Sequence, residues 1–71
     1  MSIILPVDFG NSDADGAVRL GTKQTLEAID GNSIELSRGM RVTITDDEVT
    51  AEGTTELRDG FWVVLITRWL P

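Results

Sequence analysis

A tight-turn signal between two strand-like runs constrains this chain more than any other feature of its sequence. Asp59 and Gly60 separate residues 49–57, where apolar or small side chains alternate with polar ones, from residues 61–66, which are apolar throughout. A two-residue type I′ turn needs positive φ angles at both central positions, and Asp followed by Gly adopts them readily. We therefore predict a β-hairpin in which residue 58 pairs with residue 61.

The register of this hairpin predicts which face of its two strands is buried. Counting back from the turn, the pairs on the inward face are Leu57 with Trp62, Thr55 with Val64 and Gly53 with Ile66. The two strands then agree on one inward face, so the register is self-consistent. A glycine at position 53, where a core side chain is expected, indicates a sharp bend or a close neighbouring backbone, as small barrels need in order to close.

A third strand and a charged turn precede the hairpin. In residues 40–45 apolar and polar side chains alternate, which predicts a half-buried strand with Met40, Val42 and Ile44 facing the core. Residues 46–48 read Asp-Asp-Glu, and three neighbouring carboxylates favour a solvated turn over a strand. Residues 40–66 are therefore expected to form three strands joined by two turns.

The amino-terminal half is less regular. Residues 30–33 read Asp-Gly-Asn-Ser, which is typical of a turn. We expect that turn to join residues 26–29 and 34–36 in a second hairpin. The alternative interpretation makes residues 22–29 a short helix capped by Thr22, although a helix of about eight residues is marginal in water.

These elements predict one small all-β domain over residues 1–71, in which residues 1–16 form an irregular arm or turn. A further short strand is expected at residues 17–20, which alternate between two glycines. Five or six short strands separated by turn residues, in a chain of this length, are typical of a small barrel or meander.

The strand opening at residues 36–44 carries a resemblance to a known fold family. It reads Leu-Ser-Arg-Gly-Met-Arg-Val-Thr-Ile, with a turn glycine ahead of an alternating strand. This resembles the Gly-x-x-Val-x-Ile opening of SH3-like barrels, and the resemblance extends over residues 36–67. It implies a five- or six-stranded SH3-like barrel or meander. It implies no single function, because such barrels serve as peptide binders, nucleic-acid binders and enzyme subunits.

The charge of the chain bears on its partners. Twelve Asp and Glu against six Lys and Arg give a formal net charge of −6. This charge repels nucleic-acid phosphate and anionic lipid headgroups, so we expect neither a nucleic-acid nor a membrane partner. The longest apolar run, residues 61–66, is far shorter than the roughly 20 residues of a membrane-spanning helix. Residues 1–7 do not have the pattern of a secretory signal, so we expect a cytoplasmic location.

Residue types needed for common catalytic mechanisms are missing. The sequence contains no His, no Cys and no Tyr. It therefore lacks the most frequent proton shuttle and the most reactive nucleophile of enzymes, and a chain this small can hardly enclose a substrate cleft. We expect no enzymatic activity and no cofactor.

One loop has the beginning of a calcium-binding pattern. Asn11, Asp13 and Asp15 occupy the first three ligand positions of an EF-hand loop, and Gly16 occupies its glycine position. However, Thr22 stands where a bidentate Glu should complete the ligand shell. We expect a polar turn here, and the alternative function is a calcium-binding or small-ligand-binding regulatory domain that uses this loop.

The apolar strand at residues 61–66 has apolar side chains on both faces. The side chains expected on its second face, with an aromatic residue near the carboxyl end, are Phe61, Val63, Leu65 and Trp69. Residues 3–5, residues 69–70 or another protein chain must cover that face. An exposed apolar patch in a globular protein marks an interaction site. We therefore hypothesise a non-catalytic protein-interaction module or accessory subunit that binds its own copy or another protein through this patch.

Overall fold

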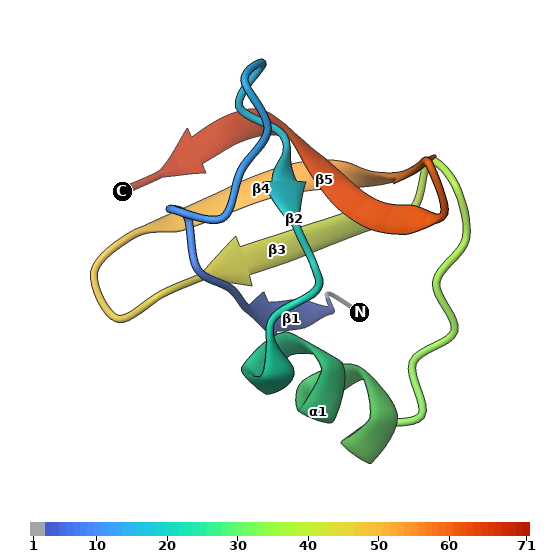
Figure 1. Ribbon diagram of the computed structural model, residues 1–71. Coiled ribbons are helices and arrows are strands. Elements are labelled where there is room, and N and C mark those ends of the chain that lie inside the picture. The colour runs from blue at the N-terminus through green and yellow to red at the C-terminus, as the bar shows by residue number, and fades with distance from the viewer. Residues whose placement is uncertain (1–2) are drawn as a thin grey trace.

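The computed structural model describes residues 3–71, whose five strands form one curled sheet, a half-barrel (Figure 1). The elements in chain order are β1 (Ile4–Pro6), β2 (Val18–Arg19), α1 (Lys23–Gly31), β3 (Arg41–Thr45), β4 (Thr50–Arg58) and β5 (Phe61–Leu70). Across the sheet the strand order is β1-β3-β4-β5-β2, with β1 parallel to β3 and the other neighbours antiparallel. The predicted all-β class is confirmed. In this part of the chain, no helix is long and apolar enough to cross a membrane.

The β4–β5 hairpin has the predicted turn and register. Asp59 and Gly60 have φ angles of 49° and 83°, which are the positive values that a type I′ turn requires. Arg58 lies opposite Phe61, and the three inward pairs follow as predicted: Leu57 with Trp62, Thr55 with Val64 and Gly53 with Ile66. The sequence-derived register is therefore confirmed along the strands up to Gly53.

Gly53 marks a β-bulge in the hairpin. The register shifts between Glu52 and Gly53, because Gly53 pairs with Ile66 while Glu52 pairs with Arg68, which leaves Thr67 as an extra residue on β5. A Cβ atom added at Gly53 would lie 2.5 Å from the Leu65 carbonyl oxygen. The predicted close approach of a neighbouring backbone at this glycine is therefore confirmed.

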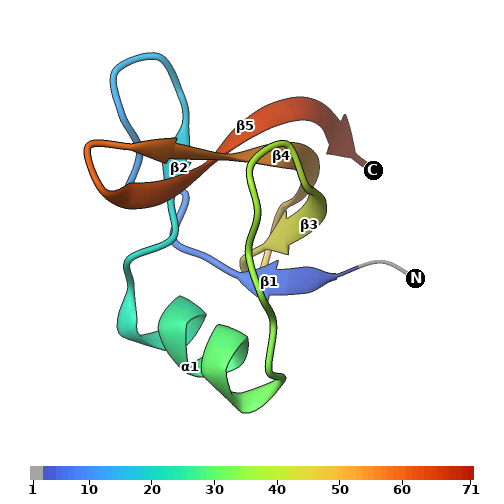
Figure 2. The ribbon, with the colours of Figure 1, turned by 90° about the vertical axis from the view of Figure 1, so that its right-hand side faces the viewer.

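The core lies between the concave face of the sheet and α1, which sits on the open side of the half-barrel (Figure 2). Its buried apolar side chains are Leu5, Val7, Val18, Leu20, Val42, Ile44, Ala51 and Val64. Met40, Trp62 and Ile66 are half-buried and pack against them. The inward faces predicted for β3 and β5 are thus confirmed. Val49 and Leu57 are exposed, because they lie beyond or near the ends of β4.

The second hairpin expected at residues 26–29 and 34–36 is wrong, because residues 23–31 form α1. The alternative interpretation, a helix capped by Thr22, is right: the Thr22 Oγ1 accepts the Thr25 backbone N–H at 3.3 Å. The buried Thr25 Oγ1 then donates to the Pro6 carbonyl at 2.6 Å. This contact with β1 supports a nine-residue helix that would be marginal in isolation.

The amino-terminal region is more regular than the sequence predicts. An irregular arm or turn is expected over residues 1–16, of which residues 1–2 lie outside the described part of the chain. Residues 4–6 instead form β1, which pairs in parallel with β3. Parallel pairing joins segments that are distant in the chain, so no local turn signal announces it.

The segment between β1 and β2 crosses from one edge of the sheet to the other and folds back on itself. The Asp13 N–H donates to the Ala17 carbonyl at 2.8 Å, and Ser12 forms a bridge to Val18. The strand predicted at residues 17–20 is present as β2, which pairs with β5. This back-folded segment, residues 12–19, therefore forms the edge of the sheet next to β5.

Candidate interaction site

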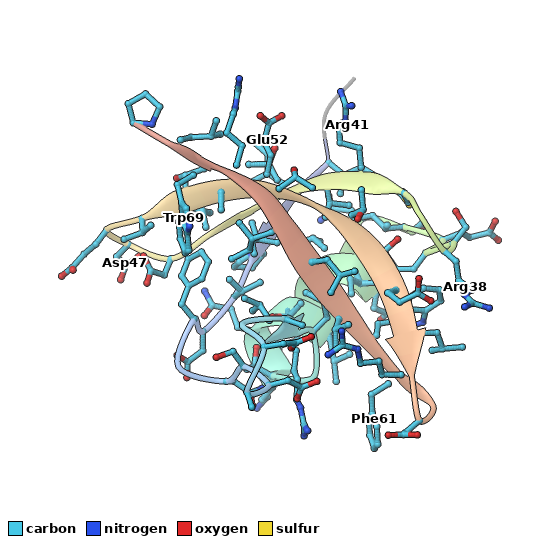
Figure 3. The ribbon with its side chains drawn as sticks, turned by 90° about the horizontal axis from the view of Figure 1, so that it is seen from above. Arg38, Arg41, Asp47, Glu52, Phe61 and Trp69 are labelled. Carbon is cyan, nitrogen blue, oxygen red and sulfur yellow. The ribbon has the colours of Figure 1, made fainter. Side chains whose placement is uncertain are left out.

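The structure divides the four residues that the sequence analysis places in one apolar patch between two hollows, one lined by Phe61 and Val63 and the other by Leu65 and Trp69. Phe61 and Trp69 are 64% and 56% exposed, but they lie at opposite ends of β5 (Figure 3). Val63 is only 1% exposed and Leu65 is half-buried. The four side chains therefore do not form one continuous exposed surface.

The back-folded segment covers the second face of β5. Arg19 lies beside Val63 in the sheet register, and both residues line a small hollow together with Asp13 and Arg58. Further along the strand, Ala17 lines a second hollow with Leu65. This cover comes from residues 13–19 of the same chain, whereas the sequence analysis considered only residues 3–5, residues 69–70 or another protein chain. The expectation that residues 3–5, residues 69–70 or another chain bury Val63 is therefore wrong.

The β-bulge changes the position of Trp69 in the strand register, although its side chain still lines a hollow together with Leu65. Because Thr67 is an extra residue, Trp69 lies opposite Ala51, a core residue, and not on the face that carries Leu65. Its ring packs against Phe9, with ring centroids 5.4 Å apart and planes inclined by 43°. Alternation counted along β5 without the bulge gives the opposite face, and Gly53 was the signal in the sequence that could have revealed this.

The loop that has the beginning of a calcium-binding pattern contributes to a cluster of ion pairs, here called the acid–arginine cluster: Asp13, Asp15, Arg19 and Arg58. The Asp13 Oδ1 lies 2.6 Å from the Arg19 Nε, and its Oδ2 lies 3.1 Å from the Arg58 Nη1. Asp15 binds Arg58 in a bidentate manner, with distances of 3.0 and 2.7 Å. Hydrogen bonds from Arg58, and then from the Ala17 backbone, lower the pKa of Asp15 to about 2. Its hydrogen bond with Arg19 lowers the pKa of Asp13.

This cluster bears on the calcium-binding alternative, which stays a prediction. The backbone carbonyl oxygen of Asn11 accepts a hydrogen bond from the backbone N–H of Arg19, with an N–O distance of 2.9 Å. A cation at this loop would have to displace guanidinium groups from both Asp13 and Asp15. Within residues 3–71, no group of three or more His, Cys, Asp or Glu side chains is placed to hold a metal ion.

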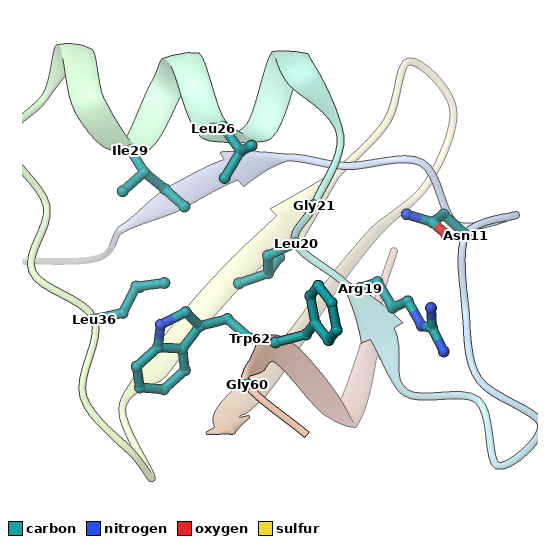
Figure 4. Close-up of a pocket in the computed structure, with 10 residues that line it drawn as sticks. Asn11, Arg19, Leu20, Gly21, Leu26, Ile29, Leu36, Gly60 and Trp62 are labelled. Atoms are coloured by element: carbon teal, nitrogen blue, oxygen red, sulfur yellow. The ribbon is translucent and has the colours of Figure 1, made fainter. Parts of the chain in front are cut away.

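A pocket of about 430 Å³ lies between α1 and the turn that joins β4 to β5 (Figure 4). The apolar side chains that line it are Leu20, Leu26, Ile29, Leu36, Phe61 and Trp62. Leu26 and Ile29 project from α1 toward the strands, and Asn11 and Arg19 are the polar side chains of the lining. A concave, mainly apolar site with few polar groups is the usual form of a binding pocket.

Three features of the chain build this pocket. Leu26 and Ile29 are three residues apart and so share one face of α1. The contact of Thr25 with β1 holds that helix in place, and the tight turn at Asp59 and Gly60 starts β5 with two aromatic residues beside the helix. Leu26 nevertheless remains 53% exposed, so the pocket has an open apolar wall on its helix side.

Sequence reasoning missed this site because it placed Leu26 in a strand and considered Trp62 only as a core residue. Trp62 does pack against the core, but it also lines the pocket. The signal that could have revealed the helical wall is the spacing of Leu26 and Ile29 after the Thr22 cap.

The fold and site together define a small all-β half-barrel with an apolar pocket at its helix. Comparisons with models of protein families, with curated proteins and with solved structures found no match for this chain.

Proposed function

We propose that this chain is a non-catalytic protein-interaction module or accessory subunit that binds a partner protein in the pocket between α1 and the β4–β5 turn. The observation that carries the proposal is that two large apolar side chains, Leu26 and Phe61, line the same pocket and are more than half exposed. Single exposed apolar residues are normal on protein surfaces, but a concave cluster of them is typical of an interaction site.

The energetic reason for binding is the removal of this apolar surface from water. Full burial of a leucine or phenylalanine side chain is worth about 1.5 to 3 kcal/mol. Phe61 and Trp62 are aromatic residues at the start of β5, and aromatic residues are frequent anchors of protein interfaces. A partner that inserts one apolar side chain would bury parts of Leu26 and Phe61 together.

The polar lining of the pocket supports a binding role over a catalytic one. Arg19 is already held by Asp13, and Asn11 is a neutral amide. Neither offers the proton transfer or the nucleophile that an enzymatic reaction needs.

The proposal includes the finer assignment of the half-barrel to the SH3-like barrels and a cytoplasmic location. The antiparallel strands β3, β4 and β5 support the SH3-like assignment, together with Gly39 ahead of β3, whose φ angle is 76°. The cytoplasmic location is kept as a prediction from the sequence.

The test is a selection of random twelve-residue peptides displayed on phage against the full chain. We expect enrichment of peptides that bind the wild type, and the combined variant Leu26→Ser, Phe61→Ser should weaken the best of them at least about tenfold. The matched control is Ile4→Ser, because Ile4 is 61% exposed on β1 and does not line the pocket. Its affinity for the same peptide should stay within about twofold of the wild type. Absence of enrichment, or equal weakening by both variants, would contradict the proposal.

A further inference from the structure

We propose that the segment bound in this pocket is basic, with lysine or arginine residues on both sides of one large apolar side chain. The inference rests on the proposed function of the same pocket and adds the chemistry of the partner. It comes from the charges that surround the apolar lining.

The apolar surface of the pocket continues along α1 into a rim of carboxylates. Two shallow hollows adjoin the pocket, and all three are lined in part by Leu26. Glu27 and Asp30 line one hollow, and Asp30 and Glu35 line the other. A fourth carboxylate, Asp59, immediately precedes Gly60, which lines the main pocket. A segment that fills the pocket therefore passes close to several acidic side chains.

The positive charges near the pocket are already engaged. Arg19 and Arg58 bind the carboxylates of the acid–arginine cluster at distances of 2.6 to 3.1 Å. Lys23 lies 4.0 Å from Glu27, so that carboxylate is partly compensated.

Three carboxylates of the rim remain without such compensation. Asp30, Glu35 and Asp59 are exposed, and none of them forms an ion pair within residues 3–71. The unbalanced charge around the pocket is therefore negative.

This charge favours a basic partner over a second copy of the chain. Two copies that met through this pocket would bring both acidic rims together, and each copy carries a net charge of −6. Like charges that face each other across an interface disfavour association when they lie within the screening length of about 8 Å. Lysine and arginine would meet the rim with opposite charge, and their long apolar stems can cover the exposed surface of Leu26.

The experiment compares two synthetic twelve-residue peptides that share the same central leucine and phenylalanine. One peptide carries lysine at its polar positions and the other carries glutamate, and binding to the full chain is followed by fluorescence anisotropy. We expect the lysine peptide to bind at least about tenfold more tightly at low salt, with an advantage that shrinks as salt is added.

Charge reversal of the rim provides the decisive variant. In the double variant Asp30→Lys, Glu35→Lys the preference should change in favour of the glutamate peptide. The matched control, Asp47→Lys, Glu48→Lys, changes the net charge equally in the exposed turn before β4 and should keep the preference for lysine. Circular dichroism checks that both variants are folded.

The outcomes separate this inference from the proposed function. Equal binding of both peptides that is lost in Phe61→Ser would overturn the basic partner and leave the interaction module standing. Self-association through the pocket, seen as sedimentation that depends on concentration in the wild type and not in Phe61→Ser, would overturn it as well. If neither peptide binds, the basic partner is overturned, and the phage selection shows whether the interaction module falls with it.

Discussion

Replacement of Gly53 by alanine should destabilise the fold strongly, although it adds a single methyl group. The new Cβ would lie 2.5 Å from both the Leu65 carbonyl oxygen and the Val64 Cγ1. Carbon atoms at van der Waals contact are about 3.5 to 4.0 Å apart, so one strand has to move by a large part of an ångström. Val64 is fully buried and cannot turn away without disturbing the core.

The magnitude follows from the cost of overpacking a buried site. Inserted methyl groups that force backbone shifts typically cost about 1 to 3 kcal/mol, and the contact with a backbone oxygen puts Gly53→Ala at about 2 kcal/mol or more. For a domain of this size, that loss lowers the melting temperature by about 8 to 16 °C. Thermal and urea unfolding followed by circular dichroism measure both quantities.

A second glycine supplies the control. Gly31 closes α1, has open space where a Cβ would be, and does not have a positive φ angle. Gly31→Ala should therefore be neutral or stabilising by up to about 1 kcal/mol. A loss of less than about 0.5 kcal/mol in Gly53→Ala would refute the close approach of the two strands and the bulge that depends on it.

Three further predictions concern the burial of Val63 on β5, the hydrogen bond between α1 and β1, and the acid–arginine cluster. Val63→Ala should cost about 1 to 3 kcal/mol by leaving a cavity at a buried site, whereas Phe61→Ser should change the free energy of unfolding by less than about 1 kcal/mol, as urea titration will show. Thr25→Val removes the hydroxyl that binds β1 and should cost about 1 to 2 kcal/mol, while Thr25→Ser should retain most of the stability. Because the pKa of Asp15 is lowered from 3.8 to about 2, its contribution to stability is complete above pH 4 and is lost as the pH falls through about 2. Acid unfolding of Asp15→Asn should lack this component, and an NMR titration that places the pKa of Asp15 near 3.8 would contradict the ion pair.

The strands of the carboxyl-terminal half could be predicted because their signals are local. Asp59 and Gly60 define the turn, and the period-two pattern on both sides then leaves one register that buries a common face. The bulge could be anticipated only in part, since Gly53 indicates a close approach but nothing at Thr67 identifies it as the extra residue. That single residue decides the strand face of Trp69, which simple alternation along β5 assigns to the opposite side.

The helix and the cover of Val63 depend on contacts between distant segments. Local propensity alone left residues 22–29 undecided between strand and helix. The choice is supported by the hydrogen bond from Thr25 to a carbonyl of β1, 19 residues away in the chain. In the same way, the burial of Val63 could not be predicted from its neighbours in the sequence. The segment that lies beside it comes more than 40 residues earlier in the chain.

The distribution of the arginines connects the cover of β5 with the charge of the pocket. Of the five arginines, Arg19, Arg38, Arg58 and Arg68 are each held by a carboxylate, and Arg19 and Arg58 are held beside Val63 by the segment that resembled a calcium loop. Because Asp13 and Asp15 bind Arg19 and Arg58, these two arginines do not balance the carboxylates beside α1. If Asp13 and Asp15 were replaced by asparagine, Arg58 would be free near the β4–β5 turn and the rim would become less acidic. The affinity for the lysine peptide should then fall although neither aspartate lines the pocket, whereas the glutamate peptide should gain.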